Sequence, residues 1–260
     1  MKHLYFTNSE IDDLNDNSKT SLNQKKGLYT PQEQYKKANQ GIKEVEVHKK
    51  SSLLSTKYFQ EPSFYANVQV NDIIKFGSYI QESDQKEPIE WIVLDKQEDK
   101  MLVISKKILD CRRYHNKRTS VTWEHSDIRT WLNHDFLNTA FTKEEQAKII
   151  ESKIINGINP LYETHCGNDT FDKVFLLSIQ EAYRYFKDSE ARCTIGSQYA
   201  LNHQLHKANN GKSYYWLRSN GCCKNDMAII LNNGNVYESG VEVVYTYYGV
   251  RPALWIKYES

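Results

Sequence analysis

Two stretches near the carboxyl end decide the fold of this chain: Tyr-Tyr-Trp-Leu-Arg-Ser at 214–219 and Gly-Val-Arg-Pro-Ala-Leu-Trp-Ile at 249–256. Both are rich in aromatic and large apolar residues, which suit a half-buried pleated surface, so each predicts a β-strand. Each strand also carries an arginine, Arg218 or Arg251, among apolar neighbours. Because a buried guanidinium needs several acceptors, we expect both to bond main-chain carbonyls or acidic side chains inside the core.

Strand alternation separates the scaffold from the surface in these stretches. Successive side chains point to opposite faces, so Tyr214, Trp216 and Arg218 should share one face of the first strand. The large residues of both strands are better suited to the scaffold than to ligand contact. We therefore predict a structural role for Trp216, Arg218, Arg251 and Trp255.

The chain between residue 72 and these strands predicts strands, then helices, then strands. The expected strands lie at 72–79, 89–96, 101–107 and 173–177. A helix is expected from His125 to Asn133 with Ser126 as its cap, and two further helices begin at capping residues Thr142 and Ser178. Asn233-Gly234 lies between two apolar runs and predicts a two-residue hairpin turn. Without a regular βαβ alternation, this order predicts an α+β fold with a largely antiparallel sheet and flanking helices.

The same pieces resemble a bacterial domain of unknown function that recurs in many otherwise unrelated proteins. The matching motifs are Phe-Gly-Ser-Tyr at 76–79, Pro-Ile-Glu-Trp-Ile-Val-Leu-Asp at 88–95, Leu-Val-Ile-Ser at 102–105, Ile-Arg-Thr-Trp-Leu-Asn at 128–133, Asp-Lys-Val-Phe-Leu-Leu-Ser at 172–178, and the two closing strands. The resemblance covers roughly residues 70 to 257. The closing Gly-Val-Arg strand is also similar to the end of C-type-lectin-like folds, which include formylglycine-generating enzymes and hypervariable receptor proteins of retroelement systems. The resemblance implies a C-type-lectin-like domain, from a family without an established activity.

The chain divides near residue 66 into a polar extension, 1–66, and the main domain, 67–260. Residues 1–30 contain few apolar anchors, so burial cannot offset their ordering entropy. Thr30-Pro31-Gln32-Glu33 then predicts a helix that runs to about His48. The extension is interpreted as a solvated tether, or alternatively as a docking helix through which the chain assembles with a partner or a second copy.

Composition narrows the classes of partner. The chain carries 34 basic and 33 acidic residues, a net charge of +1, so no strong field attracts nucleic acid or an anionic membrane. No apolar run approaches the length that spans a bilayer, and the polar residues from Thr7 onward argue against a secretory signal. Five cysteines, an odd number, favour reduced thiols. We therefore expect a cytoplasmic protein for which nucleic acid and membrane are not the partners.

The sequence shows no nucleophile motif, phosphate loop or dinucleotide fingerprint, and we expect no cofactor. His203, His206, Cys222 and Cys223 are the possible metal ligands. The cysteines are adjacent, and adjacent side chains diverge on a strand, so we expect no metal site. The resemblance to formylglycine-generating enzymes leaves one catalytic alternative, a copper-dependent oxidation of a peptide cysteine through Cys222 or Cys223.

The segment between the two arginine strands predicts a recognition surface. It is rich in Asn, Gly and Tyr, a composition that supplies polar contacts and rigid aromatic area. In lectin-like relatives this stretch forms the ligand face. The predicted ligand-binding residues are Asn220, Lys224, Asn225, Asp226, Tyr237, Glu242, Tyr245, Tyr247 and Tyr248.

These residues predict a non-catalytic module whose ligand is a protein or peptide surface. Two alternatives to the predicted surface remain. The tyrosines could simply cover the sheet, and the basic stretch 112–118, with its interleaved Tyr114 and His115, could be the contact segment instead.

Overall fold

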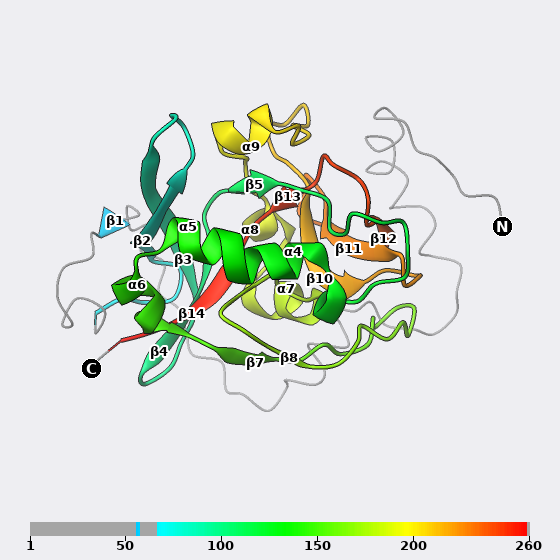
Figure 1. The fold of residues 1–260 in the computed structure, drawn as a ribbon, viewed down its shortest axis with the longest axis horizontal. Coiled ribbons are helices and arrows are strands. Elements are labelled where there is room, and N and C mark those ends of the chain that lie inside the picture. Colours follow the sequence, from blue (N-terminus) through cyan, green and yellow to red (C-terminus); the bar gives the residue numbers. More distant parts are fainter. Residues whose placement is uncertain (1–55, 58–66, 259–260) are drawn as a thin grey trace. The chain divides into compact units, whose positions relative to one another are not determined.

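The apolar runs after residue 72 form the antiparallel meander that the sequence predicts: β2 (Ile73–Ile80), β3 (Lys86–Lys96) and β4 (Lys100–Ser105). The computed structural model describes residues 56–57 and 67–258, and it shows a mixed α+β fold with mostly antiparallel sheets and short helices (Figure 1). The predicted helix at 30–48 lies outside the described residues.

The meander belongs to a seven-stranded sheet. Its strands run in the order β1-β2-β3-β4-β14-β6, with β9 also paired to β14; only the β1–β2 pair is parallel. The further strands are β1 (Thr56–Lys57), β14 (Ala253–Lys257), β6 (Ile149–Ile150) and β9 (Val174–Phe175).

A five-stranded sheet contains β10 (Tyr215–Asn220), the strand predicted from the Tyr-Tyr-Trp-Leu-Arg-Ser stretch. Strand β10 is buried along its whole length. The order is β12-β11-β10-β13-β5. Its other members are β11 (Asp226–Ile230), β12 (Val236–Glu242), β13 (Gly249–Val250) and β5 (Asp110–Cys111). A separate two-stranded sheet pairs β7 (Ser152–Ile154) with β8 (Thr170–Asp172).

The hairpin between β11 and β12 differs in one detail from the prediction. Its connection contains three residues, Asn232 to Gly234, because the Gly234 amide donates to Leu231 O and the Leu231 amide to Asn235 O. Gly234 adopts φ of 78°, as a three-residue loop with a left-handed last position requires. An added Cβ there would lie 1.7 Å from Ser189 O, so only glycine fits.

The helices begin at the predicted caps. Ser126 caps α4 (Asp127–Trp131), and complete capping boxes at Thr142 and Ser178 start α6 (Lys143–Lys148) and α7 (Ile179–Tyr185). The first helix continues beyond the predicted end at Asn133, through a π-helical turn, η3 (Leu132–Phe136), into α5 (Leu137–Ala140). The remaining helices are η2 (Trp123–His125), α8 (Ser189–Arg192) and α9 (Gln198–Asn202).

The helical run from η2 through α4 to α5 contacts both sheets, and its α4 to α5 part crosses the front of the domain in Figure 1. Helix α5 packs against β2 and η3 packs against β9, both in the larger sheet, while η2 packs against β10 in the smaller one. This position places one side of α4 and η3 next to β5, where the candidate site is found.

Both arginines that the sequence assigns to the core are buried. Arg218 donates to the carbonyls of Leu176 and Ile155 and forms an ion pair with Glu181. Arg251 donates to Ser105 O at 2.9 Å, to Arg192 O at 3.0 Å and to the Tyr215 hydroxyl at 3.0 Å.

The predicted scaffold tryptophans differ in depth. Trp216 is fully buried and its indole donates to Arg112 O. Trp255 is partly exposed, and the Lys100 ammonium lies 5.1 Å from its ring centroid. No helix in the described part of the chain is both long and apolar enough to cross a membrane.

Candidate functional site

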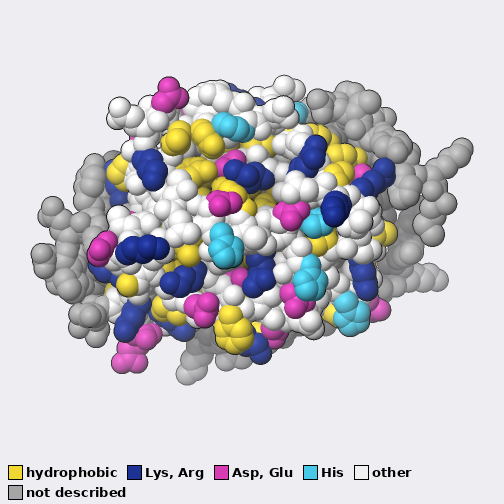
Figure 2. Space-filling model, viewed as in Figure 1, with side chains coloured by type: hydrophobic (Ala, Val, Ile, Leu, Met, Phe, Trp, Pro, Cys, Tyr) yellow, Lys and Arg dark blue, Asp and Glu magenta, His cyan; other side chains and the backbone are white. Residues whose placement is uncertain are grey.

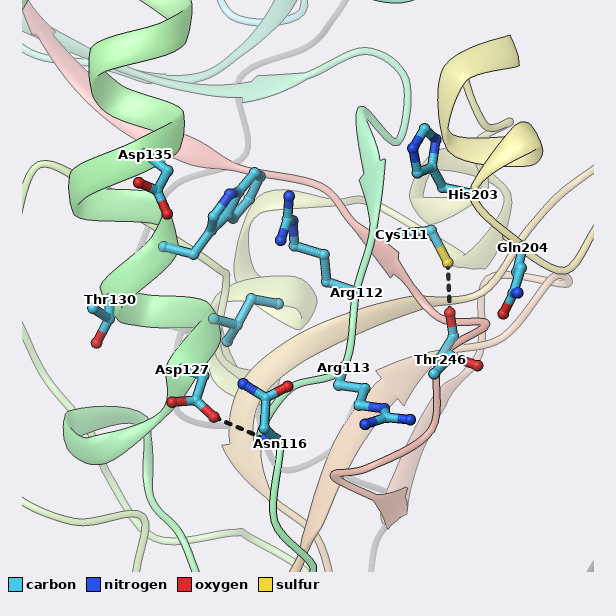
Figure 3. Close-up of a pocket in the computed structure, with 12 residues that line it drawn as sticks. Cys111, Arg112, Arg113, Asn116, Asp127, Thr130, Asp135, His203, Gln204 and Thr246 are labelled. Atoms are coloured by element: carbon cyan, nitrogen blue, oxygen red, sulfur yellow. Dashed lines mark hydrogen bonds between the residues drawn. The ribbon is translucent and has the colours of Figure 1, made fainter.

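A cavity of about 500 Å³ opens between the α4–η3 helix, strand β5 with the loop after it, and the end of α9 (Figure 3). It is lined by Cys111, Arg112, Arg113, Asn116, Asp127, Ile128, Thr130, Trp131, Asp135, His203, Gln204 and Thr246. Most of these side chains are polar or charged, and they come from four separate parts of the chain. The cavity is therefore a place where distant segments converge on one volume.

Arg112 is fixed in position on one wall of this cavity. Its guanidinium lies 4.1 Å from the ring centroid of Trp131, and its Nε is 3.4 Å from Asp110 Oδ2. Asp110 is itself buried and also accepts a hydrogen bond from the Tyr79 hydroxyl at 2.7 Å. Because a buried carboxylate and an aromatic face both hold the guanidinium, Arg112 is arranged before any ligand arrives.

Arg113 differs from its neighbour. Its side chain is exposed and lines the cavity, and among the described residues no carboxylate lies within ion-pair distance of it. Asp127, on the opposite wall, accepts from the Asn116 amide at 2.8 Å and lies 2.9 Å from His115 Nδ1. Within the part of the chain that the structure describes, the cavity thus offers the Arg113 guanidinium without a carboxylate partner and, on the facing wall, the Asp127 carboxylate, which already accepts one main-chain hydrogen bond.

Neither Cys111 nor His203 is arranged for nucleophilic chemistry. The Cys111 thiol donates to Thr246 O at 2.9 Å, and burial, with the nearby Asp110 carboxylate, raises its pKa to about 12. His203 Nδ1 lies 2.8 Å from Tyr199 O, which holds the ring in a local contact of α9. A protonated, hydrogen-bonded thiol is a poor nucleophile.

Two segments that the sequence presents as alternative contact regions lie side by side. The His115 amide donates to Val243 O at 3.0 Å and the Arg112 amide to Tyr248 O at 3.3 Å. Arg118 also forms an ion pair with Glu242. The basic stretch 112–118 and the tyrosine loop 242–248 therefore form one continuous surface.

Two tyrosines of this loop are available beside the cavity. Tyr245 and Tyr247 are partly exposed and stack on each other, with ring centroids 5.3 Å apart. Thr246, between them in the sequence, lines the cavity. The two stacked rings therefore flank a cavity-lining residue in the sequence, although neither ring lines the cavity itself.

Two of the nine predicted ligand-binding residues are buried. Asn220 is fully buried, and its side-chain amide donates to the carbonyls of Val121 and Lys224. It therefore stabilises the turn after β10 from the interior of the domain. Tyr248 is also buried, with its ring centroid 4.8 Å from that of Trp216. Asn220 points inward because β10 is buried along its whole length, and Tyr248 is buried because its ring packs on Trp216.

The other seven reach the surface to different degrees. Lys224 is exposed, and Asn225, Asp226, Tyr237, Glu242, Tyr245 and Tyr247 are partly exposed. Asp226 on β11 and Glu242 on β12 lie opposite each other in the strand register. Because Glu242 forms an ion pair with Arg118, this end of the hairpin lies beside Arg118. None of the seven lines the cavity itself.

Cys222 and Cys223 are exposed, and their Sγ atoms lie 3.6 Å apart. The expectation that the adjacent thiols diverge is wrong, because these residues follow the end of β10 in a turn and not on a strand. Burial and a hydrogen bond with Cys223 raise the pKa of Cys222 to about 12. His206 packs against Tyr214, with ring centroids 5.3 Å apart, and His203 lines the cavity, so neither joins the cysteines.

Sequence reasoning missed the helical wall of the cavity. The sequence pattern identifies Asp127 and Trp131 only as part of a helix, and it places Asp135 beyond the expected end of that helix at Asn133. Their spacing of four residues places them on one helix face, and this face carries two carboxylates and one indole instead of an apolar stripe. That departure from a normal packing face is the signal that could have identified them.

Comparison with known proteins assigns a family to this arrangement. Residues 98–258 match the family described as Domain of unknown function (DUF6273). The chain belongs to that family. The DUF6273 region contains every residue that lines the cavity, the tyrosine loop and the cysteine pair, whereas β2 and β3 precede it. Neither a curated protein nor a solved structure matches the chain.

Proposed function

We propose that this DUF6273 chain is a non-catalytic binding module that recognises a peptide segment or protein surface through the cavity and the adjoining tyrosines. The observation that carries the proposal is the joining of the basic stretch 112–118 and the tyrosine loop 242–248 along one cavity. Backbone hydrogen bonds fix both segments on the five-stranded sheet. Recognition residues on loops that a stiff scaffold supports are the usual arrangement in binding modules.

The chemistry of the cavity favours a ligand that carries both polar groups and charge. Arg113 offers a guanidinium for a ligand carboxylate, and Asp127 and Asp135 offer acceptors for a cation or amide. Charges of both signs are also interspersed over the surface around α4 and α5 in Figure 2. Peptides present this mixture of groups, while nucleic acid would require a predominantly basic surface.

The shape of the site favours a peptide over a small metabolite. Ligand pockets for small molecules enclose most of their ligand. This cavity is open, and seven of its lining residues are exposed: Arg112, Arg113, Asn116, Thr130, Asp135, His203 and Gln204. Tyr245 and Tyr247 lie just outside it and add rigid contact area with few torsions to freeze. An extended ligand could occupy the cavity and cross the tyrosines.

The proposal includes a C-type-lectin-like fold, in which the stretch between the two arginine strands forms the ligand face. The tyrosine loop 242–248 occupies that stretch. We also propose a cytoplasmic location, since the five cysteines are all unpaired thiols. The raised pKa values of Cys111 and Cys222 support a binding role over thiolate catalysis.

A random peptide display library screened against the full chain tests this proposal. Selected peptides, made synthetically, should bind the parent in calorimetry. Arg113→Ala and Tyr247→Ala should each weaken binding by about 1–2 kcal/mol, because a few central arginine and tyrosine side chains dominate such interfaces. The melting temperature should stay close to that of the parent, since both side chains are at least partly exposed.

Arg184→Ala is the matched control, because Arg184 is exposed on α7 and does not line the cavity. It should leave peptide binding unchanged. Peptides that bind Arg113→Ala and Tyr247→Ala as tightly as the parent would show that the ligand face lies elsewhere. Loss of the folded state in Tyr247→Ala would identify that ring as part of the core.

A further inference from the structure

We propose that Cys222, Cys223 and Asp226 form a binding site for one Zn²⁺ ion, on the turn that follows β10. The two Sγ atoms lie 3.6 Å apart, and Cys222 Sγ lies 3.8 Å from Asp226 Oδ2. All three potential ligand atoms lie within 4.8 Å of one another. This site is distinct from the cavity and does not depend on the proposed peptide recognition.

The spacing of these atoms suits a tetrahedral ion. With Zn–S bonds of about 2.3 Å and Zn–O bonds of about 2.0 Å, tetrahedral angles place two sulfur ligands about 3.8 Å apart and a sulfur and an oxygen about 3.5 Å apart. The observed separations of 3.6 and 3.8 Å differ from these values by only a few tenths of an ångström. The third pair, Cys223 Sγ and the Asp226 carboxylate oxygen, lies within 4.8 Å and must close to about 3.5 Å for both atoms to bind one tetrahedral ion.

The main chain of the turn is already fixed. The Gly221 amide donates to Asp226 O at 2.7 Å, and the Asp226 amide donates to Cys223 O at 3.1 Å, which closes the loop. The Cys222 amide donates to Ser239 O on β12 at 2.7 Å. An added Cβ at Gly221 would lie 2.1 Å from Ser239 O, so the glycine permits this close approach. A fixed backbone reduces the entropy lost when an ion binds.

The ligand set selects the ion. Two thiolates and one carboxylate suit a borderline-soft cation such as Zn²⁺, whereas Ca²⁺ and Mg²⁺ prefer oxygen ligands alone. A divalent cation also removes the repulsion that two thiolates and the Asp226 carboxylate would exert on one another at this distance. Both cysteines are exposed, so an ion can reach them from solvent and a water can complete the fourth position.

Zinc titration of the full, reduced chain against a chromophoric chelator tests the site, with a non-thiol reductant present. We expect one Zn²⁺ per chain to be taken from the chelator. Cys222→Ser, Cys223→Ser and Asp226→Asn should each weaken the affinity at least about tenfold, since even residues that only orient metal ligands have effects of this size. Cadmium should give an ultraviolet sulfur-to-metal charge-transfer band that each serine variant diminishes.

Cys193→Ser and Asp84→Asn are the matched controls, since both change a single thiol or carboxylate outside the proposed ligand set. They should leave zinc affinity and the cadmium band unchanged. The proposal is overturned if the reduced parent leaves all zinc with the chelator. It is also overturned if zinc binds equally well to the parent and the three ligand variants, or if a control variant loses as much affinity as they do.

Discussion

At the scale of single residues, Arg251 explains how two sheets are held together. It lies between β13 and β14, where the chain passes from the five-stranded sheet to the seven-stranded one. Its guanidinium donates to Ser105 O at the end of β4 and to the Tyr215 hydroxyl at the start of β10. One buried side chain therefore joins strands of both sheets through directed hydrogen bonds.

Arg251→Ala should lower the free energy of unfolding by about 3–5 kcal/mol, because it removes three hydrogen bonds to buried acceptors and opens a cavity between the sheets. Urea unfolding of the full chain measures the change. Exposed Arg184→Ala should stay within about 0.5 kcal/mol of the parent. A melting temperature for Arg251→Ala within a few degrees of the parent would contradict the cross-linking role.

At the scale of elements, the same capping motif serves two different purposes. Both α6 and α7 begin with a capping box, in which Glu145 and Glu181 are the acidic partners. Glu145 also accepts from the Gly77 amide near the surface. Glu181 instead forms an ion pair with Arg218, whose side chain is only 2% exposed. The second capping box is thus coupled to the core.

This difference gives a paired prediction. Glu181→Gln should lower the free energy of unfolding by about 3 kcal/mol, because the buried Arg218 guanidinium loses its counter-charge. This loss is at the low end for a broken buried ion pair, because the Glu181 side chain is 26% exposed. Glu145→Gln should lose only about 1 kcal/mol. Chemical unfolding of both variants measures the two effects, and equal losses would show that the Arg218 ion pair adds nothing beyond the cap.

Features encoded within a few residues could be predicted at this scale. Thr142 and Ser178 identify helix starts because both partners of each capping box lie within one turn. The burial of Asn220 could not be predicted, since it depends on carbonyls of Val121 and Lys224. The cavity could not be predicted either, because α4, β5, α9 and Thr246 meet only in the folded chain.

At the scale of the whole molecule, the segment from β13 to β14 makes the two sheets interdependent. The order of strands places this one segment in both sheets, beside β10 in the smaller and beside β4 in the larger. Neither sheet can lose this segment without disturbing the other. We therefore expect the domain from residue 67 onward to unfold in one cooperative transition.

A chain that begins at residue 67 tests whether the domain folds without the extension. It lacks β1, whose described residues, Thr56 and Lys57, pair with β2 at the edge of the sheet. Losing one or two hydrogen bonds there should lower the stability by about 1–2 kcal/mol. We expect this shortened chain to fold, with a single unfolding transition in circular dichroism and the peptide and zinc binding of the full chain.

Limited proteolysis of the full chain provides the complementary measurement. Cleavage should occur first within residues 1–30, whose polar composition gives them few apolar side chains to bury. Residues 70–257 should persist, since their backbone is largely committed to the two sheets and the capped helices. Early cuts inside 70–257 with the amino end intact, or an insoluble chain from residue 67, would show that the extension belongs to the folded domain.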